Sequence, residues 1–222
     1  MTTIVDHPNA DLMPDLADPT AGRVAQAREM ASAQVQLIAD PAPLGLAAFA
    51  LTTFLLSLAN SGLMPVAAEP VVLGVALAYG GLAQLLAGMW EFKKGNVFGA
   101  TVFTSYGAFW LTLVAILLMP KMGLAEKPDA HFLGMYLGLW GVFTLFMFFG
   151  TLKAARMLQF VFLSLTVLFA LLAIGHLADN EGIVKVAGWV CLIGCASAIY
   201  LAMGEVLNEQ FGRTVLPIGE PR

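Results

Sequence analysis

Six long apolar runs constrain this chain more than any other feature. Charges, prolines or glycines bound each run, and the runs lie at residues 43–64, 71–90, 97–119, 132–151, 157–177 and 183–203. Because an α-helix rises about 1.5 Å per residue, a run of about 20 residues crosses about 30 Å of hydrocarbon. Only 12% of the residues are charged, which is about half the share in an average soluble domain. The sequence therefore predicts an all-α integral membrane protein with six transmembrane helices.

Basic residues predict how these helices are oriented, since six crossings leave both termini on one side. Eight basic residues flank the runs on that side: Arg23, Arg28, Lys93, Lys94, Lys153, Arg156, Arg213 and Arg222. The opposite loops contain three, Lys121, Lys127 and Lys185. Cytoplasmic loops carry the excess of Lys and Arg in membrane proteins. Both termini are therefore predicted to be cytoplasmic.

Composition divides the chain into three parts: a cytoplasmic N-terminal tail at residues 1–39, a six-helix transmembrane domain at 40–206 and a cytoplasmic C-terminal tail at 207–222. Four aspartates stand near the start, where a secretory signal would have a basic region and an apolar core, so no such signal is expected. Residues 1–20 are expected to be disordered. From Ala21 onward, apolar residues recur at helical spacing and predict a short helix, which either lies at the membrane interface or is a solvated tail.

The first apolar run opens with a clear helix start. Asp40 is a good N-cap residue, and Pro41 suits the first helical position, where a missing N–H costs nothing. Pro43 and Gly45 follow within the next turn. We interpret this signature as the cytoplasmic entry of the first transmembrane helix.

Neutral polar side chains inside the apolar runs are candidates for a substrate path, because each needs a partner, a water or a substrate. Thr53 shares a helix face with Phe49, Gln84 lies in the second run, and Ser105 belongs to a hydroxyl stripe along residues 101–112. Ser and Thr can instead bond back to the preceding turn. We interpret the stripe as part of a hydrated path, while each single hydroxyl has both interpretations open.

Glu91 is an acidic residue at the membrane boundary, with Lys93, Lys94 and Asn96 beside it. It is either an interfacial charge balanced by the lysines or a residue that handles protons or substrate. Glu91 and Asn96 are therefore kept as possible substrate-binding residues.

Several kinds of site are not expected. Cys191 and Cys195 lie one turn apart in an apolar run with no His or acidic cluster, so they are interpreted as packing residues rather than metal ligands. His131 and His176 are interpreted as interfacial. No nucleophile with its base, no phosphate-binding loop and no basic cluster is evident. The sequence therefore predicts no enzyme activity, no cofactor, no metal and no nucleic-acid partner.

Longer motifs carry a family resemblance. The segment DPAPLGL at 40–46 resembles the NPAPLGL signature of the acetate uptake transporter family, whose bacterial members include succinate-acetate permeases. The similarity continues through YGGLAQLLAGMWEFKKGNVFG at 79–99, TSYGAFWLTLVAILLMPK at 104–121, YLGLWGVFTLFMFFGTLK at 136–153 and AIYLAMGEVLNEQFGRTVLPIGE at 198–220. It covers nearly everything after residue 39.

The resemblance implies a hexamer in the bacterial inner membrane whose protomers each have a pore for acetate and, in bacterial members, succinate. In the family a Phe, a Tyr and a Leu form the narrowest part, and these fall on Phe49, Tyr106 and Leu165. Two features depart from the family pattern. Asp40 replaces the usual Asn, and the N-terminal extension is long.

These observations predict a proton-coupled carrier of acetate and other small carboxylates, surrounded by membrane lipid and assembled as a homo-oligomer. Two alternatives stay open. The pore conducts acetate passively as an anion channel, or the protein is a membrane-embedded sensor or ammonium-response protein whose partner binds the N-terminal tail.

Overall fold

The computed structural model describes residues 19–36, 38–65 and 69–220, and these residues form helices and connections with no strand. The chain divides into two units, Met1–Ala39 and Asp40–Arg222. The first unit contains α1 (Pro19–Gln36), so a helix is present where one is predicted. The side chains of residues 22–30 are exposed. The expected disorder concerns residues 1–20, of which 1–18 lie outside the described residues, and it is wrong for Pro19 and Thr20, which belong to α1.

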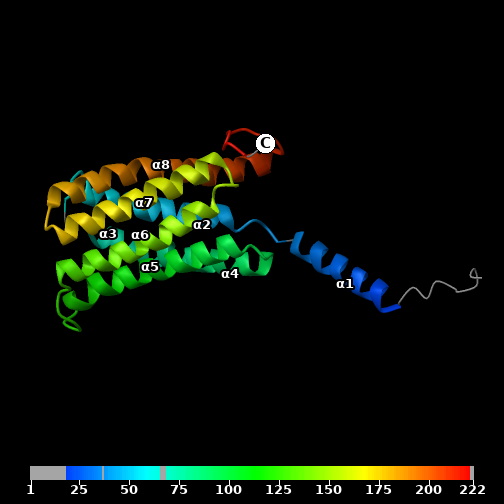
Figure 1. The fold of residues 1–222 in the computed structure, drawn as a ribbon, viewed down its shortest axis with the longest axis horizontal. Coiled ribbons are helices and arrows are strands. Elements are labelled where there is room, and N and C mark those ends of the chain that lie inside the picture. Colours follow the sequence, from blue (N-terminus) through cyan, green and yellow to red (C-terminus); the bar gives the residue numbers. More distant parts are fainter. Residues whose placement is uncertain (1–18, 37, 66–68, 221–222) are drawn as a thin grey trace, which may run out of the picture. The chain divides into compact units, whose positions relative to one another are not determined.

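In the described part of the second unit, six helical segments are long and apolar enough to cross a membrane (Figure 1). They are α2 (Ala42–Asn60), a compound second span (Pro70–Lys94), α5 (Val97–Lys121), α6 (Ala130–Gly150), α7 (Arg156–Leu177) and α8 (Glu181–Phe211). The all-helical fold and the six predicted crossings are therefore confirmed.

The second span changes its helix type in the middle. α3 (Glu69–Val75) leads into a π-helical segment, η2 (Ala76–Ala83), and α4 (Gln84–Lys94) follows directly. Gly80 in η2 lies so close to its neighbours that a Cβ there would be 2.7 Å from Thr52 of α2 and 2.9 Å from Trp110 of α5. π-helical turns are rare and are frequent at functional sites. This one ends immediately before Gln84.

Two helix ends differ from the predicted runs. The first run was expected to reach residue 64, but α2 ends at Asn60 because Gly62 adopts a left-handed φ of +81° and turns the chain. The last run was expected to end at 203, but α8 continues to Phe211 and ends at Gly212, which has a φ of +60°. Polar residues follow position 203, but no Gly or Pro stands between Gly204 and Gly212 to stop the helix.

The segment at 212–220 folds back onto the helices. The Arg156 N–H donates to the Gly219 carbonyl at 2.8 Å, and the Met157 N–H donates to the Ile218 carbonyl at 3.2 Å. The Asn208 side-chain oxygen accepts from the N–H groups of Val215 and Leu216. These bonds fix the C-terminal segment to the start of α7 and the end of α8.

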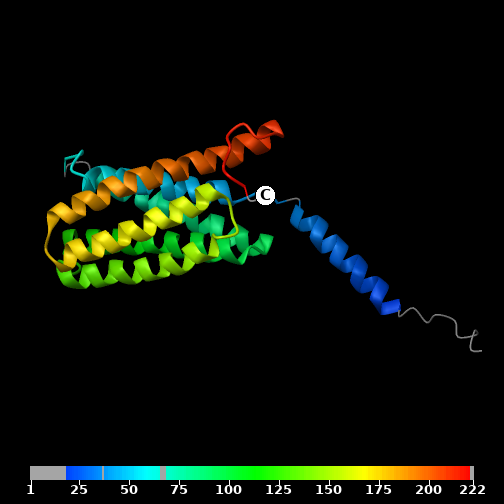
Figure 2. The same cartoon turned by 45° about the horizontal axis from the view of Figure 1, so that its top comes forward.

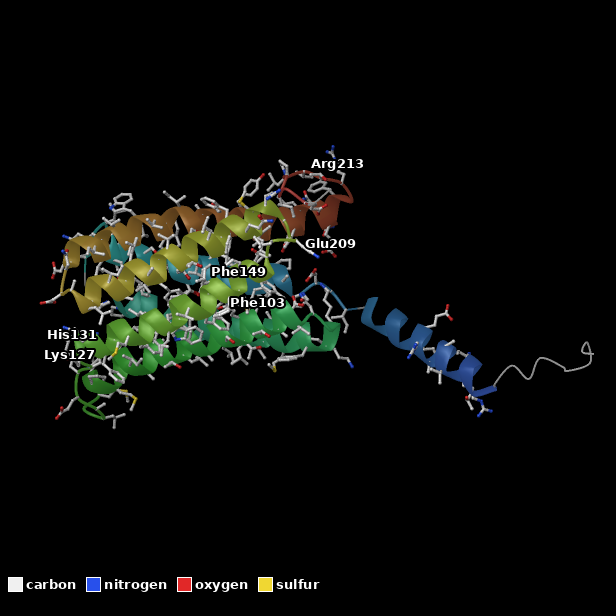
Figure 3. All side chains as sticks on the ribbon, in the orientation of Figure 1. Phe103, Lys127, His131, Phe149, Glu209 and Arg213 are labelled. Carbon is white, nitrogen blue, oxygen red and sulfur yellow. The ribbon has the colours of Figure 1, made fainter. Side chains whose placement is uncertain are left out.

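The helices alternate in direction, so the bundle has two distinct ends (Figures 1 and 2). We call them the Asp40 end, where α2 starts, and the Asn60 end, where α2 finishes. Glu209 and Arg213 lie at the Asp40 end, and Lys127 and His131 lie at the Asn60 end (Figure 3). Both the start of the bundle and its C-terminal segment thus belong to the Asp40 end, whose cytoplasmic location stays a prediction.

Small residues allow close helix contacts within this one chain. α2 packs on α8, α8 on α7, α7 on α6, and α4 on α5. A Cβ at Gly88 would lie 2.6 Å from the Thr104 backbone nitrogen, and a Cβ at Gly134 would lie 3.0 Å from Leu177. Small residues favour such contacts in membranes, where lipid competes for apolar surface. Gly134 and Gly138, one turn apart on α6, therefore face α7 of the same chain.

Aromatic side chains fill the space between α5 and α6. The ring centroids of Phe109 and Trp140 are 5.1 Å apart, and those of Tyr106 and Phe143 are 5.6 Å apart, with the rings edge to face in both pairs. This aromatic layer supports one side of the cavity described next.

Candidate functional site

A small cavity of about 10 Å³ brings together residues from four helical segments. It is lined by Leu46, Phe49, Gln84, Val102, Phe103, Tyr106, Val161, Phe162 and Leu165. The three residues predicted for the constriction are all in this wall, and so is the predicted donor Gln84. They come from α2, α5, α7 and α4. We call this space the central cavity.

The wall of the central cavity is mostly apolar. The rings of Phe49 and Tyr106 lie with their centroids 6.0 Å apart and are tilted by 34°. Leu165 faces the same space from α7, and all three side chains are buried. An apolar ring of this kind limits the size of what passes and opposes the free flow of water.

The Tyr106 hydroxyl already has a hydrogen-bond partner within the protein. Its oxygen lies 2.8 Å from the Thr144 hydroxyl, which itself lies 2.7 Å from the Trp140 carbonyl. A threonine hydroxyl has one proton, and the carbonyl can only accept. Thr144 therefore donates to Trp140, and Tyr106 donates to Thr144. Tyr106 therefore contributes its ring to the cavity, while its hydroxyl donates a hydrogen bond to Thr144 of α6.

Gln84 is the polar exception in this wall. Its side chain is 1% exposed, and neither atom of its amide group has a hydrogen-bond partner among the described residues. Buried amides normally have partners, because leaving them unpaired costs about 1–3 kcal/mol. An unpaired amide on a cavity wall suits a ligand that both accepts and donates hydrogen bonds, or water.

The two predicted hydroxyl donors are placed differently. The Thr53 hydroxyl bonds back to the Phe49 carbonyl at 2.7 Å, which is the alternative that helical Thr residues allow. Ser105 is half-buried and does not line the central cavity. Ala108 and Thr112, further along the same stripe, are exposed. In this chain the hydroxyl stripe lies on the outside of the bundle instead of along the cavity.

Glu91 is fully buried at the Asp40 end. Its side chain is 0% exposed, and neither carboxyl oxygen has a hydrogen-bond partner within the described ranges. The amide of Asn96 lies beside it without a hydrogen bond of normal geometry. The Asn96 oxygen instead accepts from the Gly99 N–H at 3.2 Å and caps α5. Glu91 is thus buried rather than exposed at the surface, and Lys94 lies close enough to interact with its charge.

A second glutamate joins Glu91 from another helix. Glu205 of α8 lies close enough to Glu91, Asp40 and Lys94 to interact with each of their charges. Its Oε2 atom is buried and has no partner in the described part of the chain. Asp40 and Lys94 form an ion pair of 2.7 Å. We call Glu91 and Glu205 the glutamate pair.

The signature residues shape the start of α2. The Asp40 carboxylate accepts from the Ala42 N–H at 3.0 Å, the kind of bond predicted for a cap. The helix begins one residue later than predicted, because α2 starts at Ala42 and Pro41 stands at the N-cap position instead of the first helical position. Pro43 is buried within the first turn. Gly45 faces α5, where a Cβ would lie 2.6 Å from the Phe103 ring. The signature therefore brings α2 against α5 beside the central cavity.

A wide hollow opens at the Asn60 end. It encloses about 1910 Å³, including open solvent, and its lining includes Lys121, Lys127, Lys185 and His176. Asp179 and Glu181 also face it. The lysines are the three basic residues that the sequence assigns to the loops opposite the termini. We call this hollow the lysine vestibule.

Comparison with known proteins identifies the family. Residues 22–219 match the family described as the GPR1/FUN34/yaaH family. The chain belongs to this family, which is the acetate uptake transporter family. The resemblance carried by the sequence motifs is thereby confirmed.

Members of the family resemble the chain over most of its length. The succinate-acetate/proton symporter SatP of Escherichia coli strain K12 is 69% identical over 183 residues, which is 82% of this chain and 96% of that protein. Acetate permease A of Emericella nidulans is 36% identical over 84% of this chain and 68% of its own length. A solved structure, described as that of the bacterial acetate channel SatP, matches with a TM-score of 0.80, 69% identity and coverage of 82% and 99% of the two chains.

Sequence analysis missed two residues of the candidate site, Thr144 and Glu205. Thr144 meets Tyr106 from 38 residues away, and nothing in the sequence pairs them. Glu205 lies within the predicted transmembrane domain at 40–206 but follows the predicted end of the last apolar run at residue 203, so it was not singled out. An acid only two residues beyond an apolar run is a signal that could have identified it.

Proposed function

We propose that this chain carries acetate and succinate across the bacterial inner membrane, coupled to protons, through a pore within each protomer. The observation that carries the proposal is the unpartnered Gln84 amide on the wall of the central cavity, between Phe49, Tyr106 and Leu165. The printed names of the relatives support it, since one is a succinate-acetate/proton symporter and another an acetate permease.

The chemistry of the central cavity suits a small carboxylate. A carboxyl group like that of acetic acid has a pKa of about 4.3 and is an anion at neutral pH. An unpaired carboxylate in hydrocarbon is prohibitively costly. The Gln84 amide can donate two hydrogen bonds to it without adding a fixed charge that would hold it too tightly. The apolar side chains of the ring would contact the methyl group of acetate.

The glutamate pair supplies a place for the coupled proton. Ionisable residues inside a membrane are costly and commonly serve proton relays. Glu91 has two unbonded carboxyl oxygens and stands two helical turns from Gln84 on the same helix. Asp40, Lys94, Glu205 and Asn96 surround it. We assign the proton-binding role to Glu91, with Glu205 as its neighbour in the relay.

The lysine vestibule supplies attraction for the anion. Three lysines and His176 face it against two acids. Clefts lined by one sign of charge raise the local concentration of the opposite ion. A carboxylate would therefore enter from the Asn60 end, and the topology predicted from the basic residues makes that the outer side.

Flux into proteoliposomes tests the transport function. Labelled succinate and acetate are offered with and without an inward proton gradient, with the membrane voltage clamped to zero. Empty liposomes are the necessary control because neutral acetic acid crosses lipid unaided. Succinate is expected to accumulate above the outside concentration only with protein and gradient, and acetate is expected to enter faster than it enters empty liposomes. Equal fluxes with and without protein would contradict any transport function.

A passive acetate channel is the second candidate, and the description of the solved relative as an acetate channel favours it. The same assay separates the two. At zero voltage a channel equilibrates its anion but cannot accumulate it when a proton gradient is imposed, and the comparison is made with succinate because neutral acetic acid leaks through lipid. Rapid, protein-dependent equilibration without accumulation would therefore replace the symporter by the channel.

The role of Gln84 has its own test. Gln84→Leu keeps most of the volume and removes both donors, and we expect acetate flux to fall about 10-fold or more, because hydrogen bonds to charged groups contribute about 1.5–3 kcal/mol. Thr53→Val is the matched control, since the Thr53 hydroxyl is already bonded to Phe49. Equal losses in the two variants would contradict a specific role for Gln84.

The hexameric assembly implied by the family resemblance also belongs to the proposal. Many large apolar side chains are exposed along the sides of the bundle, including Phe132, Leu139 and Phe146 of α6. Lipid or neighbouring protomers cover such surface in a membrane. Mass measurement of the protein in nanodiscs is expected to give six chains, and a monomer that still transports would contradict the need for assembly.

A further inference from the structure

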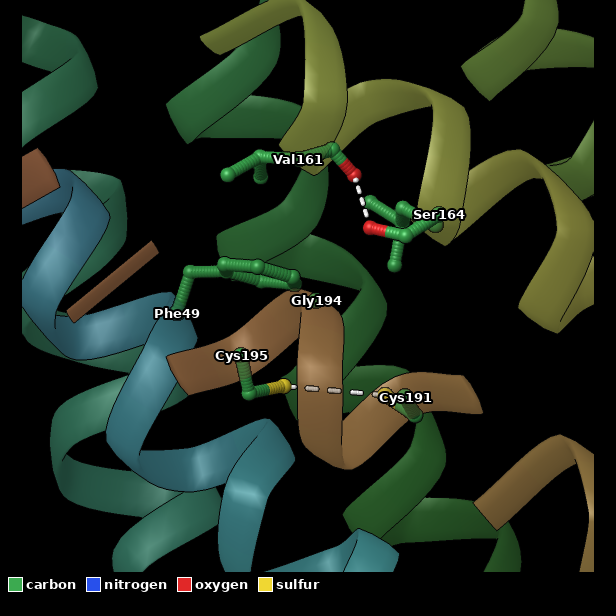
Figure 4. Close-up of a pocket in the computed structure, with 7 residues that line it drawn as sticks. Phe49, Val161, Ser164, Cys191, Gly194 and Cys195 are labelled. Carbon is green, nitrogen blue, oxygen red and sulfur yellow. Dashed lines mark hydrogen bonds between the residues drawn. The ribbon is translucent and has the colours of Figure 1, made fainter. Parts of the chain in front are cut away.

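The three residues predicted for the constriction are held in different ways. Phe49 and Leu165 are apolar, and both also line a second small space beside residues of α8 (Figure 4). Apolar side chains of this kind are held by packing alone. Tyr106 differs, because its ring ends in a hydroxyl group that is bonded to Thr144 of α6. Thr144 itself does not line the central cavity. A residue outside the constriction therefore engages the polar group of Tyr106.

Thr144 is well placed to accept the proton of that hydroxyl. Its side chain is 0% exposed, and its own proton is donated to the Trp140 carbonyl at 2.7 Å. A hydroxyl oxygen has two lone pairs, so it can still accept after its proton is engaged. The Tyr106 oxygen lies 2.8 Å from it. The Tyr106 ring also packs against Trp140 and Phe143 of the same helix, with centroids 6.0 Å and 5.6 Å away. The donor of Tyr106 is thus satisfied inside the protein.

We propose that Thr144 is a positioning residue that keeps the Tyr106 proton away from the substrate, so that a carboxylate passes the constriction without being held there. This inference rests on the proposed transport function and adds a residue to it. Hydrogen bonds to a carboxylate are about twice as strong as those between neutral groups. A free Tyr106 hydroxyl would therefore add a strong bond to those from Gln84. Conduction requires binding that is weak enough for the substrate to leave.

Removing the Thr144 hydroxyl should tighten binding and slow transport together. Thr144→Val keeps the shape of the side chain and leaves the Tyr106 donor without an acceptor. A buried donor without a partner is costly, so the hydroxyl would turn to the carboxylate when a substrate enters. We expect the KM for succinate to fall about 3–10-fold and the maximal rate to fall by a similar factor. Simple damage to the bundle would lower the rate without lowering the KM.

Three further variants identify the route of the effect. Thr144→Ser keeps the hydroxyl and should keep the KM within about twofold of the wild-type value. In a Tyr106→Phe background no phenolic proton is left to release, so adding Thr144→Val should change the KM less than about twofold. Thr151→Val is the matched control, since Thr151 is also 0% exposed, at the end of α6, and its hydroxyl donates to the Phe148 carbonyl.

Two measurements on the same variants test the proposal. Succinate uptake into proteoliposomes gives the KM and the maximal rate, and calorimetric titration of the protein in nanodiscs gives the Kd for succinate without any transport. The Kd should fall about 3–10-fold in Thr144→Val and not in Thr144→Ser. An unchanged or higher Kd in folded Thr144→Val, or an equal fall in the Tyr106→Phe background, would overturn the role of Thr144. A wild-type chain that binds succinate but shows no protein-dependent uptake would contradict the transport function instead, while the Kd comparison would still decide the role of Thr144.

Discussion

The two ends of the bundle differ in shape and in charge. The lysine vestibule at the Asn60 end is wide and open, and three lysines face it. The Asp40 end is filled by the glutamate pair, the Asp40–Lys94 ion pair and the folded-back C-terminal segment. The apolar central cavity separates them. Lysines face the hollow at one end, and buried carboxyl groups lie at the other.

The proposed function gives each transport property a different place. On that proposal, attraction of the substrate would belong to the vestibule, selection by size to the central cavity, and proton coupling to the glutamate pair. A substitution in one place should therefore change one measured quantity and leave the others near their wild-type values. The following variants are ordered from the largest expected effect to the smallest.

Glu91→Gln tests the Asp40 end most severely. The amide keeps the size of the side chain and cannot release a proton, so we expect gradient-driven accumulation of acetate to fall about 10-fold or more. Exchange of acetate at equal concentrations should stay within about threefold, because the donor at Gln84 is unchanged. Glu209→Gln, an exposed acid at the same end, is the control. Normal gradient-driven accumulation of acetate by Glu91→Gln would contradict the proposal that proton coupling depends on the Asp40 end.

Leu165→Ala should change which substrates are accepted without changing the properties of either end of the bundle. Shortening the side chain widens the wall of the central cavity, and we expect the ratio of lactate flux to acetate flux to rise about 3–10-fold. Leu168→Ala is the matched control, since Leu168 is equally buried on the same helix but does not line this cavity. Both variants remove the same core volume and should cost about 2–5 kcal/mol of stability. Unchanged selectivity in folded Leu165→Ala would exclude Leu165 from the constriction.

The contrast between the ends could be predicted only in part from the sequence. Six helices follow from run length, and the opposite placement of the lysines follows from counting crossings. The burial of Glu91 does not, because Lys93 and Lys94 beside it suggest an interface. It depends on Gly99, where a Cβ would lie 2.7 Å from the Glu91 carboxyl carbon, so the carboxyl group packs against α5.

The central cavity could also be predicted only in part from the sequence. Phe49, Tyr106 and Leu165 come from the family resemblance, since spacing within single helices cannot bring residues of α2, α5 and α7 together. Helical spacing alone favoured the hydroxyl stripe at 101–112, which lies on the outside because glycines on the other face of α5 draw the second span against it. For example, a Cβ added at Gly107 on that face would lie 2.7 Å from the Leu85 backbone nitrogen. The π-helical turn before Gln84 has no evident sequence signature.

Neutralising the vestibule should have a smaller effect than either change above. For Lys127→Met with Lys185→Met we expect the KM for acetate to rise about threefold at low salt, because long-range attraction is lost. The difference should shrink near 1 M salt, where the screening length is about 3 Å. Lys93→Met, at the exposed surface of the Asp40 end, is the control. An equal change in both variants would show that the vestibule has no special role in attraction.

Asp40→Asn should have the smallest effect, although it changes the family signature position. The asparagine oxygen can still accept from the Ala42 N–H, so only the ion pair to Lys94 is lost. The two side chains are 42% and 31% exposed, and such pairs contribute about 0–1 kcal/mol. We expect acetate flux to change less than about twofold, whereas Asp40→Ala also loses the cap and should cost about 1 kcal/mol more in stability. A large loss of accumulation in Asp40→Asn, with the fold intact, would mean that the Asp40 charge acts on the glutamate pair and that coupling extends to the mouth of the bundle.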